Sequence, residues 1–306
     1  MKPLISYYGG KQRLAPKIVP LLPKHTVYVE PFCGGAAVFF SKPWPPVTNS
    51  HHYREVLNDL DGRLINLYRV IRHPDLGPEL ISRLECTLYS RDEHYLSKKV
   101  LTTNNKWSNI DLAWAYYVNI QQSFANKLLS GWGTGVYGRN LAFTWINKIS
   151  HLRDYIARLK SVHIEHDDAL NVIRRWDSPQ TLFFCDPPYP GSDQGHYNGY
   201  TSDDFASLIE TLNTCQGSFV LSNYKQPGIP EHWERFEFSS YCSASSKGRS
   251  GKNRDKARSA TKAELGNVKR TEMVWRMDRS ANARPEIQKI WGKWYGNNEN
   301  KNMLLW

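Results

Sequence analysis

An acid, two prolines and an aromatic residue stand together after an apolar run beyond the middle of the chain. Asp186-Pro187-Pro188-Tyr189 directly follows Thr181 to Cys185, a run that is typical of a buried strand. Proline has a fixed φ and no backbone N–H, so the pair ends ladder pairing and holds the turn in one shape. Such a strand end places a carboxylate, rigid carbonyls and a flat stacking surface at one spot. This combination suits chemistry on the exocyclic amino group of a nucleobase.

The amino nitrogen of adenine attacks poorly because its lone pair is delocalised into the ring. Asp186 and the carbonyl of Pro187 could accept its two hydrogens and shift the nitrogen toward sp3 geometry. Tyr189 could stack on a base swung out of the duplex, the route by which enzymes reach an atom inside the base stack. The alternative is an ordinary strand end, since Asp and Pro are common turn residues. We favour the functional interpretation and treat it as a hypothesis.

A second group of candidate residues lies in the first sixty positions. Val27 to Phe32 is predicted to be a strand. The following segment, Cys33 to Phe40, is predicted to contain a turn at Gly34 and Gly35 and then the start of a helix. Glu30 falls at the strand end. Strand, glycine turn and helix in succession are typical of a nucleotide-type cofactor site, where glycines let the backbone approach the ligand.

Two further polar residues fit such a site. Glu55 to Asp59 is predicted to be a second strand, and Asp59 falls roughly 20 residues after the glycine turn, where an acid accepts ribose hydroxyls in such folds. Its alternative role is a helix N-cap. Lys11 follows Gly9 and Gly10 and could meet a cofactor carboxylate, although a surface lysine is the more common outcome.

The remaining pattern predicts an α/β fold with one interruption. Helical spacing over Leu60 to Ile71 follows the second strand, and this alternation of strands and helices implies a parallel sheet. Further strands are predicted at Ser161 to Ile164, Ser218 to Ser222 and Met273 to Arg276. The segment 78–154 breaks the alternation and is predicted to be a mainly helical inserted subdomain. Residues 1–77 and 155–276 then form the main domain, and 277–306 form a C-terminal extension without a motif.

The inserted segment and a later basic stretch are candidates for contact with an anionic partner. Trp114, Tyr117 and Trp145 are expected in the core, whereas a glycine-punctuated loop at Leu129 to Asn140 is expected to be exposed. Lys247 to Arg270 is rich in Lys and Arg and should be mobile when free. It either contacts phosphates or forms a solvated loop.

Composition narrows the class of partner. The chain has 306 residues with 40 Lys and Arg against 29 Asp and Glu, a net charge of +11 that favours an anionic partner. Its five cysteines contain no C-x-x-C pair and no histidine at metal spacing, which is typical of reduced thiols in a cytosolic protein. No apolar stretch approaches the ~18 residues of a membrane span. We therefore expect a cytoplasmic protein with no metal and no membrane.

Five segments in this order resemble one known family. They are Tyr8-Gly9-Gly10-Lys11, Val29 to Gly35, Leu57-Asn58-Asp59, Asp186 to Tyr189 and Leu221-Ser222-Asn223. The chain is similar to the Dam-type DNA adenine-N6 methyltransferases, the alpha group of the D12 class. In that group the cofactor motifs come first and the target-recognition segment is inserted before D-P-P-Y. The resemblance extends from residue 1 to about residue 276.

The resemblance implies a Rossmann-like S-adenosylmethionine (SAM)-dependent methyltransferase fold with a mainly helical target-recognition insertion. The implied reaction transfers a methyl group from SAM to N6 of a flipped-out adenine in double-stranded DNA, with S-adenosylhomocysteine as the product. The implied catalytic residues are Asp186, Pro187, Pro188 and Tyr189, and the implied cofactor contacts are Tyr7, Lys11, Glu30, Pro31, Phe32, Gly34, Gly35, Asp59 and Asp186. Glu165 to Asp168 is expected near the cofactor adenine.

Partner predictions follow from the same resemblance and from the inserted segment. DNA contacts are predicted at Asn126, Lys127 and Arg139. A restriction endonuclease is a candidate partner in a bacterial or phage setting.

The chain departs from the family pattern in two places. Tyr7 stands where many members have tryptophan, which keeps stacking but changes the cofactor pocket. The segment Val118 to Lys127 lacks the pattern that reads GATC, so that recognition site is not predicted. Two alternatives stay open: an amino methyltransferase acting on cytosine N4, RNA or a protein glutamine, and a DNA-binding relative that has lost catalysis.

Overall fold

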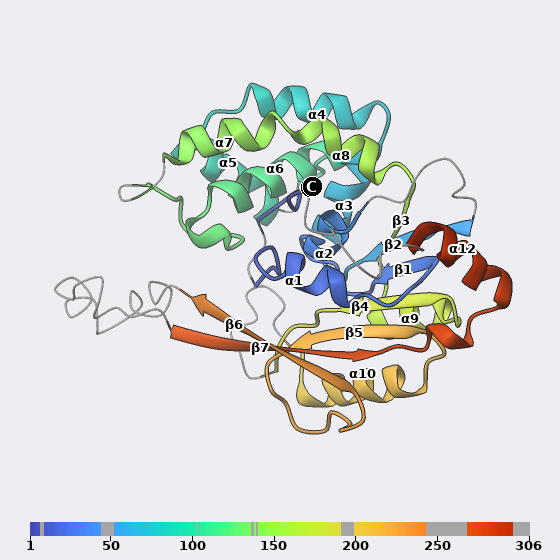
Figure 1. Ribbon diagram of the computed structural model, residues 1–306. Helices are drawn as coiled ribbons and strands as arrows, with labels where there is room; N and C mark the ends of the chain where they lie inside the picture. The colour runs from blue at the N-terminus through green and yellow to red at the C-terminus, as the bar shows by residue number, and fades with distance from the viewer. Residues whose placement is uncertain are drawn as a thin grey trace.

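A seven-stranded sheet with helices on both faces forms the centre of the molecule (Figure 1). The structure is a computed structural model that describes residues 1–6, 9–43, 52–103, 105–135, 138, 140–190, 199–242 and 268–295. The strand order is β3-β2-β1-β4-β5-β7-β6. The strands are β1 Val27–Glu30, β2 Arg54–Asn58, β3 Val162–Glu165, β4 Thr181–Cys185, β5 Ser218–Asn223, β6 Glu234–Cys242 and β7 Val268–Met277.

Helices connect the parallel strands and cover both faces of the sheet. The α-helices are α1 Ala15–Ile18, α2 Ala37–Ser41, α3 Gly62–Arg72, α4 Leu76–Glu85, α5 Arg91–Thr102, α6 Asn109–Gln122, α7 Leu141–Ile149, α8 Leu152–Leu159, α9 Ala169–Trp176, α10 Ser202–Thr214 and α12 Pro285–Tyr295. The 3-10 turns that the described residues define are η1 Val19–Leu21, η3 Phe124–Asn126 and η5 Ser280–Asn282. Polar side chains mark several of the helix starts. Ser108 with Asp111 and Thr201 with Asp204 form capping boxes before α6 and α10.

The predicted parallel sheet is confirmed for β1 to β5 and wrong for β7. β1 to β5 pair in parallel, whereas β7 pairs antiparallel with β5, and β6 pairs antiparallel with β7. β6 therefore runs in the same direction as β5, and β7 lies between them in the opposite direction. The sequence prediction also omitted β6. Phe236 and Phe238 alternate there with charged residues, a two-residue period that could have identified this strand.

Side chains of the central strands alternate between two hydrophobic cores. On β4, Leu182 and Phe184 belong to the core under α1–α8, whereas Phe183 and Cys185 belong to the core under α9 and α10. The first core is the larger, because the long crossover between β2 and β3 contributes α3 to α8. Figure 1 shows this helical layer on one side of the sheet and α9 and α10 on the other.

The segment that was predicted as a helical insertion is helical and packs on α3. Its helices α4 to α8 run from Leu76 to Leu159, slightly beyond the predicted bounds at both ends. Trp114, Tyr117 and Trp145 are buried, as expected. Because these side chains join the core that covers the sheet, the helical segment and the main fold share one apolar interior. The division into subdomains at residues 78 and 154 stays a prediction.

A buried ion cluster fixes α8 to the sheet. Arg158 donates two hydrogen bonds to Glu55 on β2, at 2.5 and 2.8 Å, and Lys42 Nζ lies 2.6 Å from the same carboxylate. The guanidinium also lies 3.7 Å from the ring centroid of Phe39. A buried charge is tolerated only with such partners, since desolvation costs several kcal/mol per ion.

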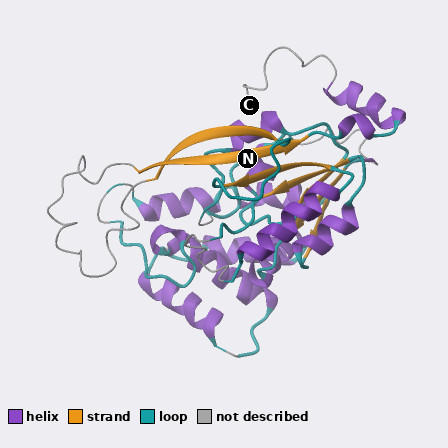
Figure 2. Cartoon of the chain, turned by 90° about the horizontal axis from the view of Figure 1, so that it is seen from below, coloured by secondary structure: helices purple, strands orange, loops and turns teal. Residues whose placement is uncertain are grey.

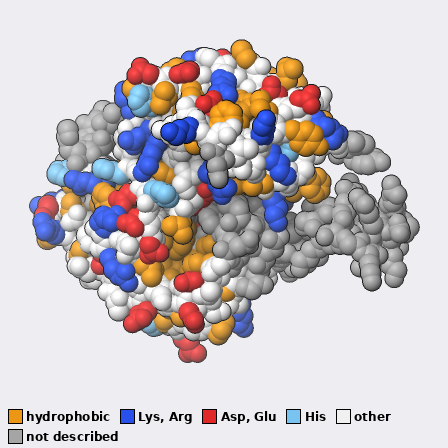
Figure 3. Space-filling model, turned by 180° about the vertical axis from the view of Figure 1, so that it is seen from behind, with side chains coloured by type: hydrophobic (Ala, Val, Ile, Leu, Met, Phe, Trp, Pro, Cys, Tyr) orange, Lys and Arg blue, Asp and Glu red, His pale blue; other side chains and the backbone are white. Residues whose placement is uncertain are grey.

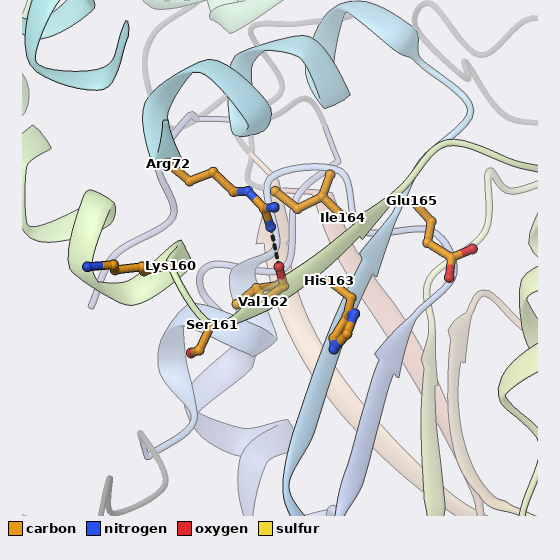
Figure 4. A pocket seen from close by; sticks show the side chains of 7 residues that line it. All are labelled: Arg72, Lys160, Ser161, Val162, His163, Ile164 and Glu165. Carbon is orange, nitrogen blue, oxygen red and sulfur yellow. Dashed lines mark hydrogen bonds between the residues drawn. The ribbon is translucent and has the colours of Figure 1, made fainter. Parts of the chain in front are cut away.

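The outer edge of β3 is covered by a side chain. Arg72 of α3 donates a hydrogen bond to the carbonyl of Val162. Because β3 is an edge strand of the sheet, this side chain takes the place of a neighbouring strand there. Figure 4 shows this contact beside a shallow cavity of about 400 Å³ that is also lined by Lys160, His163 and Glu165.

The C-terminal part contains more structure than the sequence indicated. β7 ends at Met277, and α12 follows with a small core of Ala283, Ile287 and Trp291. The β6–β7 hairpin extends past the other strands, as Figures 1 and 2 both show. Within the described ranges, no helix combines the length and apolarity that are needed to cross a membrane.

The buried ion pair between Arg158 and Glu55 predicts a large effect on stability. Arg158→Met should lower the free energy of unfolding by about 3–5 kcal/mol, because Glu55 is left buried beside a single cation. Urea denaturation measures this change. Arg153→Met on the same helix is the matched control. Arg153 is exposed and pairs weakly with Glu85, at 3.9 Å, so this substitution should change the free energy of unfolding by no more than about 0.5 kcal/mol. Equal losses in the two variants would contradict this account of α8.

Candidate active site

The two motif regions predicted from sequence meet at the middle of the sheet. β1 and β4 are parallel neighbours, with Val29 opposite Phe183, although about half the chain separates them in sequence. The strand order changes direction between β1 and β4, because β2 leads to one edge and β5 to the other. Ligands of open α/β sheets bind at the carboxyl ends of the strands at such a switch point. The glycine turn after β1 and Asp186 after β4 occupy this position.

The turn after β1 is held in a shape that favours glycine. Gly34 has φ +47° and Ala36 has φ +51°, both in the left-handed region. The backbone N–H of Gly34 donates to Asp59 Oδ2 at 2.8 Å, and the amide of Asn58 donates to the Pro31 carbonyl at 2.9 Å. The end of β2 therefore braces this turn. Its shape is set before any ligand binds.

Asp59 lies where the sequence predicted it, but its carboxylate also has a structural role. It is 3% exposed, and its two oxygens accept backbone N–H groups from Gly34 and Asp61. The alternative role as the helix N-cap is wrong, since Asp61 caps α3 by accepting from the N–H of Arg63. Contact of Asp59 with a cofactor ribose stays a prediction.

Glu30 is buried and bonded to its own fold. Its Oε1 accepts the Tyr28 hydroxyl at 2.7 Å and the backbone N–H of Phe39 at 2.8 Å, which ties β1 to the first turn of α2. Burial raises the pKa of Glu30 from 4.5 to about 8, and the nearby charge of Asp186 adds to the rise. The carboxyl is therefore largely protonated at neutral pH. Its predicted cofactor contact stays a prediction.

Lys11, Asp186 and Tyr189 form a compact cluster. Lys11 Nζ lies 2.8 Å from Asp186 Oδ1, and the Tyr189 hydroxyl donates to the same oxygen at 3.1 Å. Lys11 Nζ also lies 4.8 Å from the centroid of the Tyr189 ring. At 7% exposure, Lys11 is not the surface lysine that was the alternative for it. The N-terminal segment therefore reaches the end of β4.

Two residues that were not predicted complete the cluster. Glu272 on β7 lies 3.3 Å from Lys11 Nζ and accepts the hydroxyls of Tyr189 and Ser222. Ser222 was noted within a motif but without a role. Glu272 directly precedes the predicted strand Met273 to Arg276, and an acid adjoining an apolar strand was the available signal in the sequence.

The charges in this cluster stabilise one another. Burial raises the pKa of Asp186 and the charge of Glu272 adds to the rise, whereas Lys11 opposes it. Burial by itself favours the neutral amine of Lys11, but Asp186 and Glu272 outweigh that effect and raise the pKa of Lys11 above its ordinary value. The ammonium therefore persists between two carboxylates. Its positive charge offsets the repulsion between the two neighbouring carboxylates.

Two acceptor atoms in this cluster receive no hydrogen bond from the described residues. Within the residues that the structure describes, Asp186 Oδ2 accepts no hydrogen bond, because both of its donors contact Oδ1. The Pro187 carbonyl likewise accepts none from the described part of the chain. A carboxylate oxygen and a carbonyl next to each other can receive the two hydrogens of an amino group. Across those same residues, no His, Cys, Asp or Glu cluster could hold a metal ion.

Several predicted contacts lie elsewhere or outside the described residues. Phe32 is partly buried and packs edge to face with Tyr200 at 6.2 Å. The Glu165 to Asp168 segment adjoins the end of β2, since the N–H of Asp167 donates to Asn58 Oδ1 at 2.9 Å. Asp168 itself caps α9. Tyr7, Arg139 and positions 247–267 of the basic stretch are not among the described residues.

The predicted DNA-contact residues Asn126 and Lys127 lie on a strained loop after α6. Ala125, Asn126 and Leu129 have φ of +57°, +53° and +60°, which non-glycine residues rarely adopt. Asn119 Oδ1 accepts the N–H of Leu129 at 2.7 Å and pins the loop to α6. Phe124 is 49% exposed there. Figure 3 shows Lys and Arg side chains spread among hydrophobic ones over the upper, helical part of one face.

Comparison with known proteins identifies one family. The family model "D12 class N6 adenine-specific DNA methyltransferase" matches residues 7–242, which include the turn after β1, the helical segment and Asp186 to Tyr189.

Individual relatives are similar at low identity. The type II methyltransferase M1.LlaDCHI of Lactococcus lactis subsp. cremoris is 26% identical over 288 residues, covering 87% of this chain and 96% of that protein. The DNA N-6-adenine-methyltransferase of Escherichia phage P1 is 23% identical over 239 residues, covering 74% of this chain and 30% of that protein. Among solved structures, the rRNA methyltransferase aviRa from Streptomyces viridochromogenes has a TM-score of 0.38 and 12% identity, covering 90% of this chain and 89% of that one.

The raised pKa of Glu30 predicts a pH-dependent stability. A carboxyl whose pKa is higher in the folded state stabilises the fold below pH 4.5, and this contribution is lost as the pH rises to about 8. The side chain of the Glu30→Gln variant cannot ionise. As the pH rises, the free energy of unfolding of the parent should therefore fall relative to that of the variant by a few kcal/mol, at ~1.4 kcal/mol per pKa unit. Urea denaturation of both proteins from about pH 5 to about pH 9 measures the difference. A difference that does not change with pH would contradict the assignment.

Proposed function

The chain belongs to the D12 class of N6 adenine-specific DNA methyltransferases, and we propose that the Asp186 cluster is where it methylates adenine N6 in double-stranded DNA. The observation that supports this location is a pair of acceptors, Asp186 Oδ2 and the Pro187 carbonyl, that receive no hydrogen bond from the residues that the structure describes. These acceptors match the two hydrogens of an exocyclic amine. They lie at the switch point of the sheet, where a cofactor and a base can meet.

The methyl donor of this family chemistry is SAM, and the residues of the site fit it. SAM supplies, when bound, an electrophilic methyl group on a sulfonium. Asp186 and Glu272 outnumber Lys11 in the cluster, and this excess of negative charge complements the positive charge of the sulfonium. Lys11 is suited to the cofactor carboxylate. The braced turn at Gly34 lets the cofactor approach the backbone, as in other nucleotide-type sites.

The residues of the chain act on the target amine. Asp186 and Pro187 accept the N6 hydrogens and localise the nitrogen lone pair, which then forms the N–C bond as the methyl–sulfur bond breaks. S-adenosylhomocysteine would leave with the electron pair of the broken bond, and N6 would release its proton to water after the transfer. Positioning the two reactants supplies most of the acceleration. Tyr189 stacks on the flipped base.

The inserted helical segment is proposed as the target-recognition part. Its loop after α6 is pinned by Asn119 and carries Phe124, Asn126 and Lys127 on the surface. Strain of this kind is found where a loop must present side chains in one arrangement. Lys127 contributes phosphate contact and Phe124 an apolar surface for bases.

Two further aspects of function remain proposals. The Lactococcus relative is named a type II methyltransferase, and on that basis a restriction endonuclease is the candidate partner of this chain. A cytoplasmic, DNA-associated location follows from the same function. The alternative of cytosine N4 methylation is disfavoured by the adenine-specific family match.

Removal of the Asp186 carboxylate tests the catalytic assignment. Asp186→Ala should lower methylation by about 10²-fold or more, because the amine loses its charged acceptor. SAM binding should weaken and DNA binding should largely survive. Mass spectrometry of digested DNA measures the product and separates N6-methyladenine from N4-methylcytosine. Asp203→Asn, on the exposed first turn of α10, is the control and should keep parent activity; near-normal turnover of Asp186→Ala would disprove the role.

Removal of the Lys127 charge tests the DNA-contact loop. Lys127→Ala should weaken DNA binding at low salt and reduce the slope of log affinity against log salt by about 1. Fluorescence anisotropy with a DNA duplex across a salt series measures both. Lys160→Ala, beside the outer edge of β3, is the control with the same loss of charge. Identical slopes for the two variants would argue against phosphate contact at Lys127.

A further inference from the structure

Glu272 reaches the Asp186 cluster from a strand that the family match does not cover. It lies on β7, whereas the match ends at residue 242. In the β5–β7 ladder, Asn223 pairs with Met273 as the last residue of β5. Glu272 therefore stands one position beyond the carboxyl end of β5. Its side chain is 6% exposed.

All contacts of Glu272 bring donors to the same oxygen. Oε1 lies 3.3 Å from Lys11 Nζ, accepts the Ser222 hydroxyl at 3.0 Å and accepts the Tyr189 hydroxyl. Lys11 and Tyr189 are also the two groups that contact Asp186 Oδ1. The two carboxylates thus share one pair of donors. Each donor is held between them rather than by Asp186 alone.

We propose that Glu272 is a positioning residue for methyl transfer, which holds Lys11 and the Tyr189 hydroxyl so that the second oxygen of Asp186 stays open for the target amine. The inference rests on the proposed function, since it requires Asp186 to accept that amine. An ammonium has three N–H donors and a phenol has one O–H donor. Without Glu272, these donors can turn to both oxygens of Asp186 and compete with the amine for them.

The same contacts orient the ring of Tyr189. Its hydroxyl is bound by Glu272 and Asp186, and its ring packs edge to face with Tyr224 at 4.6 Å. With one end anchored and a neighbouring ring beside it, the Tyr189 plane has little freedom. A base that stacks on this ring would find it already oriented. Loss of Glu272 removes part of that anchor.

Single-turnover methylation by Glu272→Gln tests the inference. With SAM and DNA both saturating, we expect the rate constant of the Gln variant to fall by about 10²-fold, the effect of a small misplacement of reacting groups. The dissociation constant for DNA should match that of the parent, and the one for SAM should change less than the rate. Glu237→Gln on β6, an exposed residue, is the matched control and should keep the parent rate.

A second substitution separates positioning from a general loss of structure. If the Tyr189 hydroxyl occupies Asp186 in the Glu272→Gln variant, Tyr189→Phe in that background should recover part of the rate. The combined loss would then be smaller than the product of the two single losses, a non-additivity that a double-mutant cycle measures. Losses that multiply, or a Gln variant with the parent rate, would overturn the inference.

The outcomes for Glu272 and for the proposed function are distinguishable. Normal turnover of Asp186→Ala would refute the catalytic assignment itself. An inactive Asp186→Ala with a fully active Glu272→Gln would refute only the role of Glu272. Glu272→Asp keeps the charge one methylene farther away and should have an intermediate rate. If the Gln variant does not fold, the cycle with Tyr189→Phe is measured in the Glu272→Asp background, with the same two outcomes.

Discussion

The burial of one ammonium between two carboxylates is the interaction on which the catalytic arrangement depends. Lys11 comes from the N-terminal segment, Asp186 from the end of β4 and Glu272 from β7. A charge removed from water must have a partner at short range, because the cost of desolvation is otherwise too large. The cluster can therefore form only when the first segment, the central strand and the last strand of the sheet are all in place. The site and the complete fold are coupled by this requirement.

The same rule joins the helical layer to the sheet. Arg158, Glu55 and Lys42 form a second buried ion cluster that connects α8, β2 and the end of α2. The helical segment also shares its apolar core with α3 and the sheet. These contacts fix the helical segment relative to the strands. In the proposed function, DNA held by the loop after α6 would therefore have a defined position relative to the acceptors at Asp186 and Pro187.

The site also divides its acids by environment. Among the described residues, no cation is in hydrogen-bond contact with Glu30; burial raises the pKa of its carboxyl, which links β1 to α2 in its neutral form. Asp59 braces the turn after β1 through backbone N–H groups. Asp186 contacts Lys11 through Oδ1, and its Oδ2 accepts no hydrogen bond from the described part of the chain. Three acids at neighbouring strand ends therefore have three different roles, which their partners decide rather than their residue type.

The motifs of the sequence were sufficient to predict the family, the α/β class and the five strands that form the parallel part of the sheet. Those predictions succeed because the signals are local: an apolar run, a glycine turn and an acid at a strand end each occupy a few adjacent residues. β6, the antiparallel course of β7 and the role of Glu272 were missed. Which strands pair depends on contacts between residues far apart in sequence. Whether a carboxylate is a solvated surface group or a buried hydrogen-bond acceptor depends on what packs around it. Residue types and spacing thus determined which chemistry this chain carries. Only the tertiary structure decided that an acid from the last strand shares the lysine of the first segment, because burial of charge is a property of the assembled fold.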